Sequence, residues 1–131
     1  VALAPLRGRA AALAARGWRV KESEIQDAVR LALGTIRGVC CWRNNVGTAE
    51  HWTGTSVQRV RYGLAPGSAD LVGLVDGRFF ALEIKAPGGR VAPEQEQWLA
   101  LVRRNGGFAA VVRSADEARA CVERCRAGAS Q

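Results

Sequence analysis

The sequence predicts an α/β layered domain in which a mixed β-sheet is flanked by helices. Its 131 residues fit one domain that is long enough to close a single core. A hydrophobic content of 48% argues against disorder. The predicted elements follow the order helix, three strands, helix, strand, helix, which is typical of a layered α/β fold. No apolar run approaches the ~20 residues of a membrane span, so no membrane association is expected.

The first predicted core helix follows Lys21. Ser23 and Gln26 have the spacing of a capping box, which predicts that the helix begins after Ser23. Ile25, Val29 and Leu33 then fall on one side, and Gly34 suits the end. We expect residues 1–20 to be a helical appendage or an added extension. Arginines run through that Ala-rich stretch, which argues against a signal peptide.

The middle of the chain is predicted to contain a short strand, a long loop and a hairpin. Residues 39–42 are apolar and predict the strand. Residues 44–68 are rich in Gly, Thr, Ser and Asn and predict the loop, although residues 59–62 alternate as a half-buried strand would. Residues 69–75 and 78–85 are β-like on either side of Asp76-Gly77, a two-residue hairpin turn.

The last third predicts a helix, a strand and a helix. Pro93 suits the first position of a helix that runs to about Asn105. Residues 108–112 read as a short buried strand. Ser114 begins a second capping box, which opens a helix to about Ala127.

The charge and the cysteines narrow the class of protein. The formal net charge is +7, which favours a polyanionic partner, nucleic acid before membrane. Abundant Arg, Ala and Gly are also typical of a GC-rich genome, so charge alone leaves the partner open. Cys40, Cys41, Cys121 and Cys125 form no C-x2-C pair, which argues against a zinc site. Four reduced cysteines packed as small hydrophobic residues suit an intracellular protein.

The hairpin turn fixes a register that brings two carboxylates together. With Asp76-Gly77 as the loop, Asp70 faces Glu83. Opposed carboxylates destabilise a sheet unless a cation lies between them, and their oxygens are ligands that Mg²⁺ or Mn²⁺ prefers. Lys85, two residues beyond Glu83, projects from the same face. The alternative interpretation is a solvated hairpin end that carries a Glu–Lys pair.

Two further residues are candidates for the same site. Gln95 heads an apolar helix face, so its amide either bonds to the backbone or points into a polar site. Glu24 lies in the first turn of the first helix, where a carboxylate usually acts only as a partner of the helix dipole.

These residues resemble a known motif. Residues 67–70, Gly-Ser-Ala-Asp, followed after twelve residues by Glu83-Ile84-Lys85, are similar to the PD-(D/E)xK nuclease motif. The run from Lys85 to Gln95 resembles the VRR-NUC branch of that superfamily, as do residues 43–47 and 107–114. The resemblance covers roughly residues 22–117.

The resemblance implies a restriction-endonuclease-like core, with residues 21–131 as the nuclease domain. It implies metal binding by Asp70 and Glu83, with the carbonyl of Ile84 as a further ligand. Lys85 has an implied catalytic role, and Glu24 and Gln95 have implied supporting roles. Mg²⁺ or Mn²⁺ is the implied cofactor, with no small-molecule cofactor. Stand-alone members resemble dimeric Holliday-junction resolvases, so we expect a homodimer that acts on branched or flapped DNA in the cytoplasm of a bacterial or phage-infected cell, on the nucleoid.

Residues outside the motif complete the hypothesis. Arg43, Arg59, Arg61 and Arg90 are candidate phosphate contacts, although each is equally consistent with an ordinary solvated side chain. Trp52 and Tyr62 are placed either to stack on bases or to pack in the core. The alternative function is a basic nucleic-acid-binding module whose nuclease fold has no activity. A sequence-specific restriction-type nuclease is less favoured, because 131 residues leave little room for a recognition domain.

Overall fold

A computed structural model describes residues 19–131, so the helix predicted within residues 1–18 lies outside the described residues. The elements are α2 (Glu22–Leu33), β1 (Val39–Arg43), β2 (Gly47–Trp52), β3 (Val57–Tyr62), β4 (Leu71–Val75), β5 (Arg78–Ile84), α3 (Pro93–Arg104), β6 (Phe108–Val112) and α4 (Ala115–Arg126).

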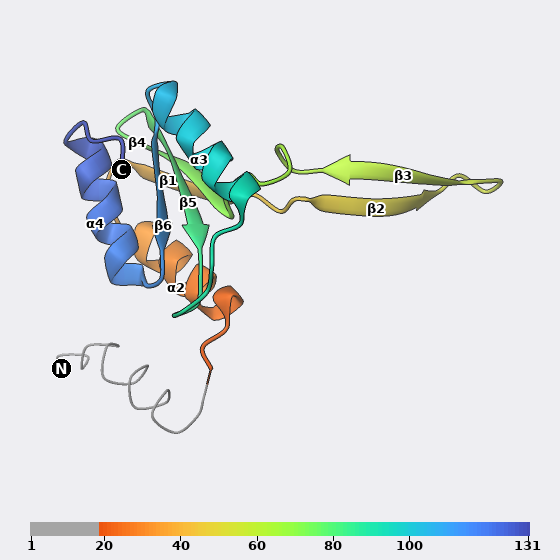
Figure 1. The fold of residues 1–131 in the computed structure, drawn as a ribbon, viewed down its shortest axis with the longest axis horizontal. Coiled ribbons are helices and arrows are strands. Elements are labelled where there is room, and N and C mark those ends of the chain that lie inside the picture. The colour runs from red at the N-terminus through yellow and green to blue at the C-terminus, as the bar shows by residue number, and fades with distance from the viewer. Residues whose placement is uncertain (1–18) are drawn as a thin grey trace.

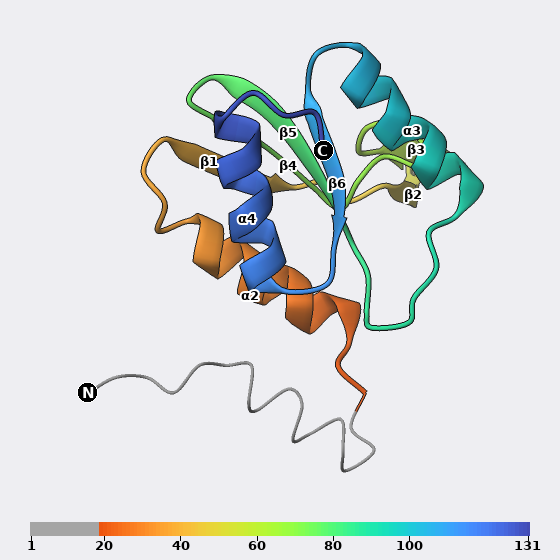
Figure 2. The same cartoon turned by 60° about the vertical axis from the view of Figure 1, so that its left-hand side comes forward.

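The central sheet has four strands in the order β1-β4-β5-β6. The β1–β4 and β4–β5 pairs are antiparallel and the β5–β6 pair is parallel, so the sheet is mixed. Helices α2 and α4 pack together on one face, and α3 packs on the other (Figure 1, Figure 2). The prediction of a mixed sheet flanked by helices is therefore confirmed.

The two faces of the sheet are packed differently. The face under α2 and α4 holds the large side chains of the main core, among them Leu71, Phe80 and Phe108. The face under α3 is lined by small residues, because Ala81 and Ala109 lie beneath Leu99. Small side chains let the helix approach the strands closely, and this brings the first turn of α3 next to the end of β5.

The predicted hairpin register is confirmed. Leu71 pairs with Leu82 and Val75 with Arg78. The turn residues Asp76 and Gly77 adopt φ values of 49° and 82°. Both values are positive, as a two-residue hairpin turn of this type requires.

The start of the first helix was predicted wrongly. Helix α2 begins at Glu22 with Lys21 as its N-cap, and not after Ser23. The Lys21 N–H is satisfied by the Glu24 carboxylate at 3.1 Å, so the helix start does not depend on the Ser23 hydroxyl. In contrast, Ser114 accepts a hydrogen bond from the Glu117 N–H and caps α4 as predicted.

Most of the predicted long loop is a two-stranded antiparallel ribbon, so the chain has two strands more than the predicted order. Strands β2 and β3 pair from Gly47–Tyr62 to Trp52–Val57 and project from the body (Figure 1). The alternation at residues 59–62 correctly indicated a strand, but this strand is exposed and not half-buried as expected, and β2 was missed. Because both faces of β2 are in solvent, its sequence lacks the alternation of apolar and polar residues that marks a half-buried strand.

Within residues 19–131, no helix is both long enough and apolar enough to cross a membrane.

Candidate active site

The candidate site lies where β4 begins and β5 ends. Asp70 directly precedes β4, and its Oδ2 atom accepts a hydrogen bond of 2.8 Å from the Ile84 N–H. This bond holds the Asp70 carboxylate across the end of β5. The hairpin pairing predicted from the sequence therefore does bring Asp70 to the strand that carries Glu83.

Glu83 is almost fully enclosed, with 1% of its surface exposed. Its Oε1 atom accepts a hydrogen bond from the Gln95 amide and lies 3.1 Å from the Lys85 ammonium. Lys85 is itself largely buried, and its side chain lies on the same face as that of Glu83, as predicted. The Gln95 side chain also accepts a 2.9 Å hydrogen bond from the Ala92 N–H. The sequence offered two alternatives for the Gln95 amide, and both are realised: its oxygen bonds to the backbone and its nitrogen points into a polar site.

The electrostatics of the site favour an additional positive charge. Burial, followed by repulsion from Asp70, raises the pKa of Glu83 from 4.5 to about 7, although Lys85 partly offsets the rise. Burial also raises the pKa of Asp70, against the lowering effects of the Ile84 N–H and of Lys85. One ammonium therefore does not compensate two enclosed carboxylates, and a bound cation would favour the ionised form of both.

A third carboxylate approaches the site from α2, and it is Glu22 and not Glu24. The Glu22 Oε1 atom accepts a hydrogen bond of 3.4 Å from the Ala86 N–H, and its charge raises the pKa of both Asp70 and Glu83. The structure does not bring Glu24 to this cluster, because its carboxylate binds the Lys21 N–H. The two glutamates lie two residues apart in the first turn of α2, and no sequence signal distinguished them.

Asn44 positions Asp70 from the neighbouring strand, a role that the sequence analysis did not identify. Its amide nitrogen donates to the Ser68 hydroxyl at 2.7 Å and to the Ala69 carbonyl at 2.8 Å. Its amide oxygen accepts from the Leu64 N–H at 3.0 Å, and its backbone N–H donates to the Asp70 carbonyl at 2.8 Å. These four bonds fix the segment that leads into Asp70.

Arg113 fixes the segment that follows Lys85, and no sequence signal indicated this role. Its guanidinium donates to the Ala86 carbonyl at 2.6 Å and to the Gly89 carbonyl at 2.9 Å. The segment between Lys85 and α3 is therefore tied to the end of β6.

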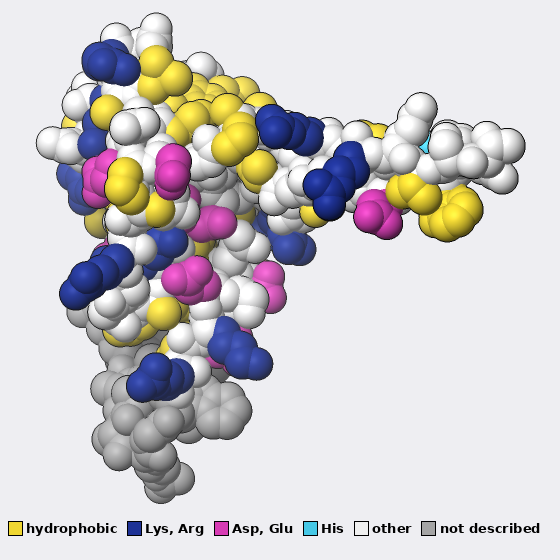
Figure 3. All heavy atoms as spheres, turned by 45° about the vertical axis from the view of Figure 1, so that its right-hand side comes forward, with side chains coloured by type: hydrophobic (Ala, Val, Ile, Leu, Met, Phe, Trp, Pro, Cys, Tyr) yellow, Lys and Arg dark blue, Asp and Glu magenta, His cyan; other side chains and the backbone are white. Residues whose placement is uncertain are grey.

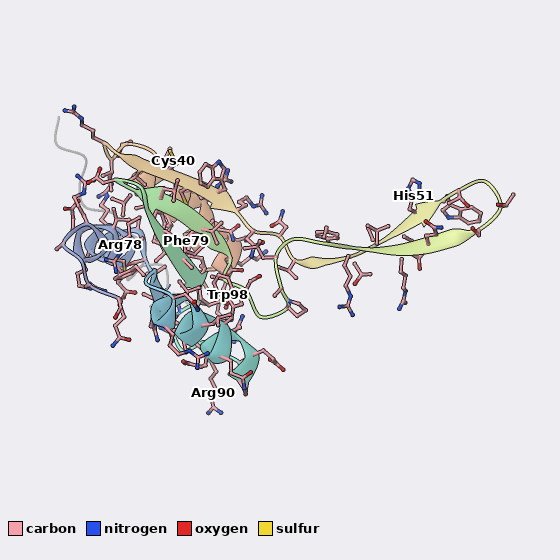
Figure 4. All side chains as sticks on the ribbon, turned by 90° about the horizontal axis from the view of Figure 1, so that it is seen from above. Cys40, His51, Arg78, Phe79, Arg90 and Trp98 are labelled. Atoms are coloured by element: carbon pink, nitrogen blue, oxygen red, sulfur yellow. The ribbon has the colours of Figure 1, made fainter. Side chains whose placement is uncertain are left out.

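The candidate DNA contacts are spread over the surface. Arg43 is exposed at the end of β1, and Arg59 and Arg61 are exposed on β3. Arg90 is exposed in the segment before α3 and points away from the sheet (Figure 4). Trp52 and Tyr62 lie on the ribbon with 72% and 46% of their surfaces exposed, so the interpretation of these two as core residues is wrong.

The four cysteines are free, but they differ in burial. Cys121 and Cys125 pack in the core beneath α4, as small hydrophobic residues would. Cys41 is partly buried and Cys40 is exposed, so the expectation that all four pack as small hydrophobic residues is wrong for Cys40.

The donor set at the strand ends fits Mg²⁺ or Mn²⁺ with few protein ligands. Among the described residues, no three or more His, Cys, Asp or Glu side chains form a group that could hold a metal ion by themselves. Mg²⁺ is typically held by one or two carboxylates, with water and substrate phosphate completing its shell. Asp70 and Glu83 would supply two such carboxylates, and the backbone carbonyl of Ile84 remains a predicted further ligand.

Comparison with known proteins gives one family. A search of curated proteins finds no match to the chain. The sequence profile of the VRR-NUC domain matches residues 20–116, which is most of the chain and includes every residue of the site described above. The chain therefore belongs to the VRR-NUC domain family, and this region is a nuclease-type domain.

Proposed function

We propose that this protein is a divalent-metal-dependent, structure-selective DNA endonuclease built on a restriction-endonuclease-like core. Its substrate would be branched DNA, such as a Holliday junction, and its metal Mg²⁺ or Mn²⁺. The observation that carries the proposal is the enclosed Asp70–Glu83 pair with the Lys85 ammonium 3.1 Å from Glu83. Burial raises the pKa of both carboxyl groups, and Asp70 raises that of Glu83 further, so a nearby cation would favour their ionised forms. The substrate of a nuclease brings a phosphate to complete that cation's shell.

Each side chain then has a distinct part in phosphodiester hydrolysis. Asp70 and Glu83 would hold the cation, which supplies Lewis-acid activation of the phosphate and of the attacking water. Lys85 would orient that water and offset the negative charge that grows on the phosphate oxygens as the P–O bond breaks. Gln95 would keep the Glu83 carboxylate in one orientation, because it is anchored on the Ala92 N–H.

Glu22 would support the same chemistry from the opposite side. A carboxylate there adds negative charge, which strengthens the attraction for a cation and offers a position for water. Glu24 provides the matched control, because it lies two residues further along the same helix and its carboxylate binds the Lys21 N–H instead. Glu22→Gln is expected to lower the cleavage rate at a fixed metal concentration, and Glu24→Gln is expected to leave it close to the wild-type rate.

An exposed apolar patch supports the proposal that the protein is a homodimer. Trp42, Leu74, Phe79 and Leu101 are 53%, 37%, 37% and 46% exposed. They surround the half of the sheet that α3 leaves uncovered, and hydrophobic side chains gather there in Figure 3. Contiguous exposed apolar patches mark association surfaces. Two active sites related by a two-fold axis would suit the symmetric cutting of a junction. Light scattering that shows only a species of 14.0 kDa would contradict the dimer.

The experiment that tests the function is a cleavage panel. Purified protein is incubated with duplex, single-stranded, flapped and four-way-junction DNA, with Mg²⁺, with Mn²⁺ or with EDTA. Cleavage of branched DNA that depends on the metal is expected. Asp70→Asn and Lys85→Ala should each lower the rate by about 10² to 10⁴. Asp76→Asn is the matched control, because that carboxylate lies in the hairpin turn and pairs with Arg126. If the wild-type protein binds DNA but cuts none of these substrates, the inactive binding module becomes the better account.

A further inference from the structure

The β2–β3 ribbon stands apart from the rest of the domain. Its strands contact each other extensively and make no substantial contact with any other helix or strand of the described chain. All of its residues are exposed except Gly47. A two-stranded ribbon is marginally stable by itself in water. A ribbon built to stand in solvent is therefore expected to have a binding partner when the protein functions.

The two faces of the ribbon differ in chemistry. The register places Thr48, Glu50 and Trp52 on the same face as their partners Arg61, Arg59 and Val57. The opposite face carries the pairs Gly47–Tyr62, Ala49–Val60 and His51–Gln58. Large apolar side chains are thus divided: Trp52 and Val57 lie at the tip on the arginine face, and Val60 and Tyr62 lie nearer the base on the other. No face is continuously apolar, which argues against a protein partner as the main occupant.

The arginine face is suited to a polyanion. Arg59 and Arg61 are two residues apart on one strand, so their side chains leave the same face about 7 Å apart. This spacing is about two steps of the 3.4 Å rise along one DNA strand. Of the ion pairs formed within residues 19–131, none includes Arg59 or Arg61. Their charges are therefore available, although Glu50 faces Arg59 across the ribbon.

The position of the ribbon links it to the candidate active site. The chain enters the ribbon after Asn44 and returns through Ser68, and Asn44 is bonded to the Ser68 side chain and to the carbonyls of Ala69 and Asp70. The segments that lead into and out of the ribbon are therefore tied to the backbone next to Asp70, and the ribbon extends away from the body (Figure 1, Figure 4). Each of its strands has six residues, so the paired part extends about 20 Å, the length of about six base pairs.

We propose that this ribbon enters a groove of the duplex next to the bond that is cut, with Arg59 and Arg61 on backbone phosphates. Two strands about 4.8 Å apart fit the major groove, which is about 12 Å wide and admits a two-stranded ribbon. The inference rests on the proposed function and adds a requirement to it: the substrate must carry a stretch of duplex beside the branch. Trp52, at the tip, would contact the far end of that stretch.

The test compares two double variants that lose the same charge. Arg59→Ala with Arg61→Ala removes the ribbon arginines. Arg37→Ala with Arg119→Ala is the control, because both residues are exposed and lie on the body, before β1 and on α4. Binding to a four-way junction with 20-base-pair arms is measured by fluorescence anisotropy in EDTA at 50 and 200 mM salt. Circular dichroism checks that each variant is folded.

Two lost phosphate contacts lower the slope of log affinity against log salt by about 1.8. Over this fourfold salt range, the wild-type affinity should fall about twelvefold more than that of the ribbon variant. The control variant should keep the wild-type slope.

The outcomes separate the inference from the function beneath it. If the wild-type protein binds and cuts junctions but the ribbon variant keeps the wild-type slope, the ribbon proposal is overturned and the nuclease proposal stands. If the wild-type protein neither binds nor cuts any DNA, both fail. The alternative partner of the ribbon is a second copy of the chain, which sedimentation velocity tests. If the ribbon variant forms a smaller assembly than the wild-type protein and the control variant does not, the ribbon binds a second copy and the proposal is overturned.

Discussion

Replacing Glu83 by glutamine should stabilise the metal-free protein at alkaline pH. The pKa of Glu83 is raised from 4.5 to about 7, first by burial and then by Asp70. Above pH 7 the folded state must hold this carboxylate ionised, whereas the unfolded chain does so without cost. The shift of 7 − 4.5 = 2.5 pH units corresponds to about 3 kcal/mol at about 1.4 kcal/mol per unit. This shift already includes the attraction of Lys85; because a glutamine amide replaces the protonated carboxyl imperfectly in its hydrogen bonds, the expected net gain is about 1 to 3 kcal/mol.

The sign of the pH dependence follows from the raised pKa. Below pH 4.5 both states hold the proton and Glu83 costs nothing. Between pH 4.5 and 7 the folded state binds more protons than the unfolded state, so the stability of the wild-type protein falls as pH rises through this window. The advantage of Glu83→Gln should therefore be close to zero at pH 4.5, grow up to pH 7 and stay constant above it.

Urea unfolding in EDTA, followed by tryptophan fluorescence at pH 4.5 and pH 8, measures this difference. A gain of 1 kcal/mol should raise the thermal midpoint by roughly 3 to 5 °C for a domain of this size. Mg²⁺ should stabilise the wild-type protein and have no effect on the variant. Glu123→Gln, at an exposed position on α4, is the control. If Glu83→Gln is no more stable than the wild-type protein at pH 8, burial and repulsion do not dominate at this carboxylate and the reasoning is refuted.

Three further outcomes are expected. Asn44→Ala should lower the free energy of unfolding by about 1.5 to 3 kcal/mol, because three side-chain hydrogen bonds are lost, and should lower cleavage more than the exposed control Asn45→Ala; unchanged urea midpoints would contradict this. Gly73→Ala should unfold or strongly destabilise the domain, since a Cβ atom there would clash with the Cys40 carbonyl oxygen, whereas a Cβ atom at Gly34, whose φ is −63°, meets no atom closer than 3.2 Å; a Gly73→Ala protein as stable as Gly34→Ala would refute the packing argument. Iodoacetamide at pH 8 should modify exposed Cys40 before Cys41, because burial raises the pKa of Cys41 to about 11. Mass spectrometry of peptides measures the order, and modification of Cys41 first would contradict this expectation.

The hairpin that carries the candidate site could be predicted because its geometry is local. Asp76 and Gly77 determine the turn, and the turn determines every pair as far as Leu71 and Leu82. The closeness of Asp70 to the end of β5 follows from counting along two strands. The position of Lys85 follows from the two-residue periodicity of a strand.

The choice between the two glutamates of α2 could not be made in the same way. Both glutamates lie in the first turn of α2. The residue at which this helix begins is not marked in the sequence, because the N-cap Lys21 has no side-chain acceptor. Ser23 offered a familiar capping pattern, and this pattern directed attention to Glu24. The contact of Glu22 with Ala86 joins residues that are far apart in the sequence, so only the folded chain reveals it.

The ribbon as a whole was not predicted, because the sequence of β2 shows no alternation of apolar and polar residues. The periodicity of apolar residues reports which face of a strand meets a core, and neither face of β2 or β3 meets one. The roles of Asn44 and Arg113 were missed for a related reason. Each holds backbone groups of a distant segment, and such bonds leave no regular spacing in the sequence.

The chain leaves the body at Asn44 and returns within hydrogen-bonding distance of the same residue, at Ser68 and Ala69. Residues 45–67 therefore form an excursion from the body, and the hydrogen bonds of Asn44 join the residues at its two ends. The length and composition of β2 and β3 can therefore vary with little effect on the spacing of the carboxylates, and the cost of a longer excursion rises only slowly with length. If the proposed roles hold, substrate choice and bond cleavage would lie on separately variable parts of one small chain. Exchanging the excursion between members of the family would then transfer the preferred DNA structure while the chemistry stays in place.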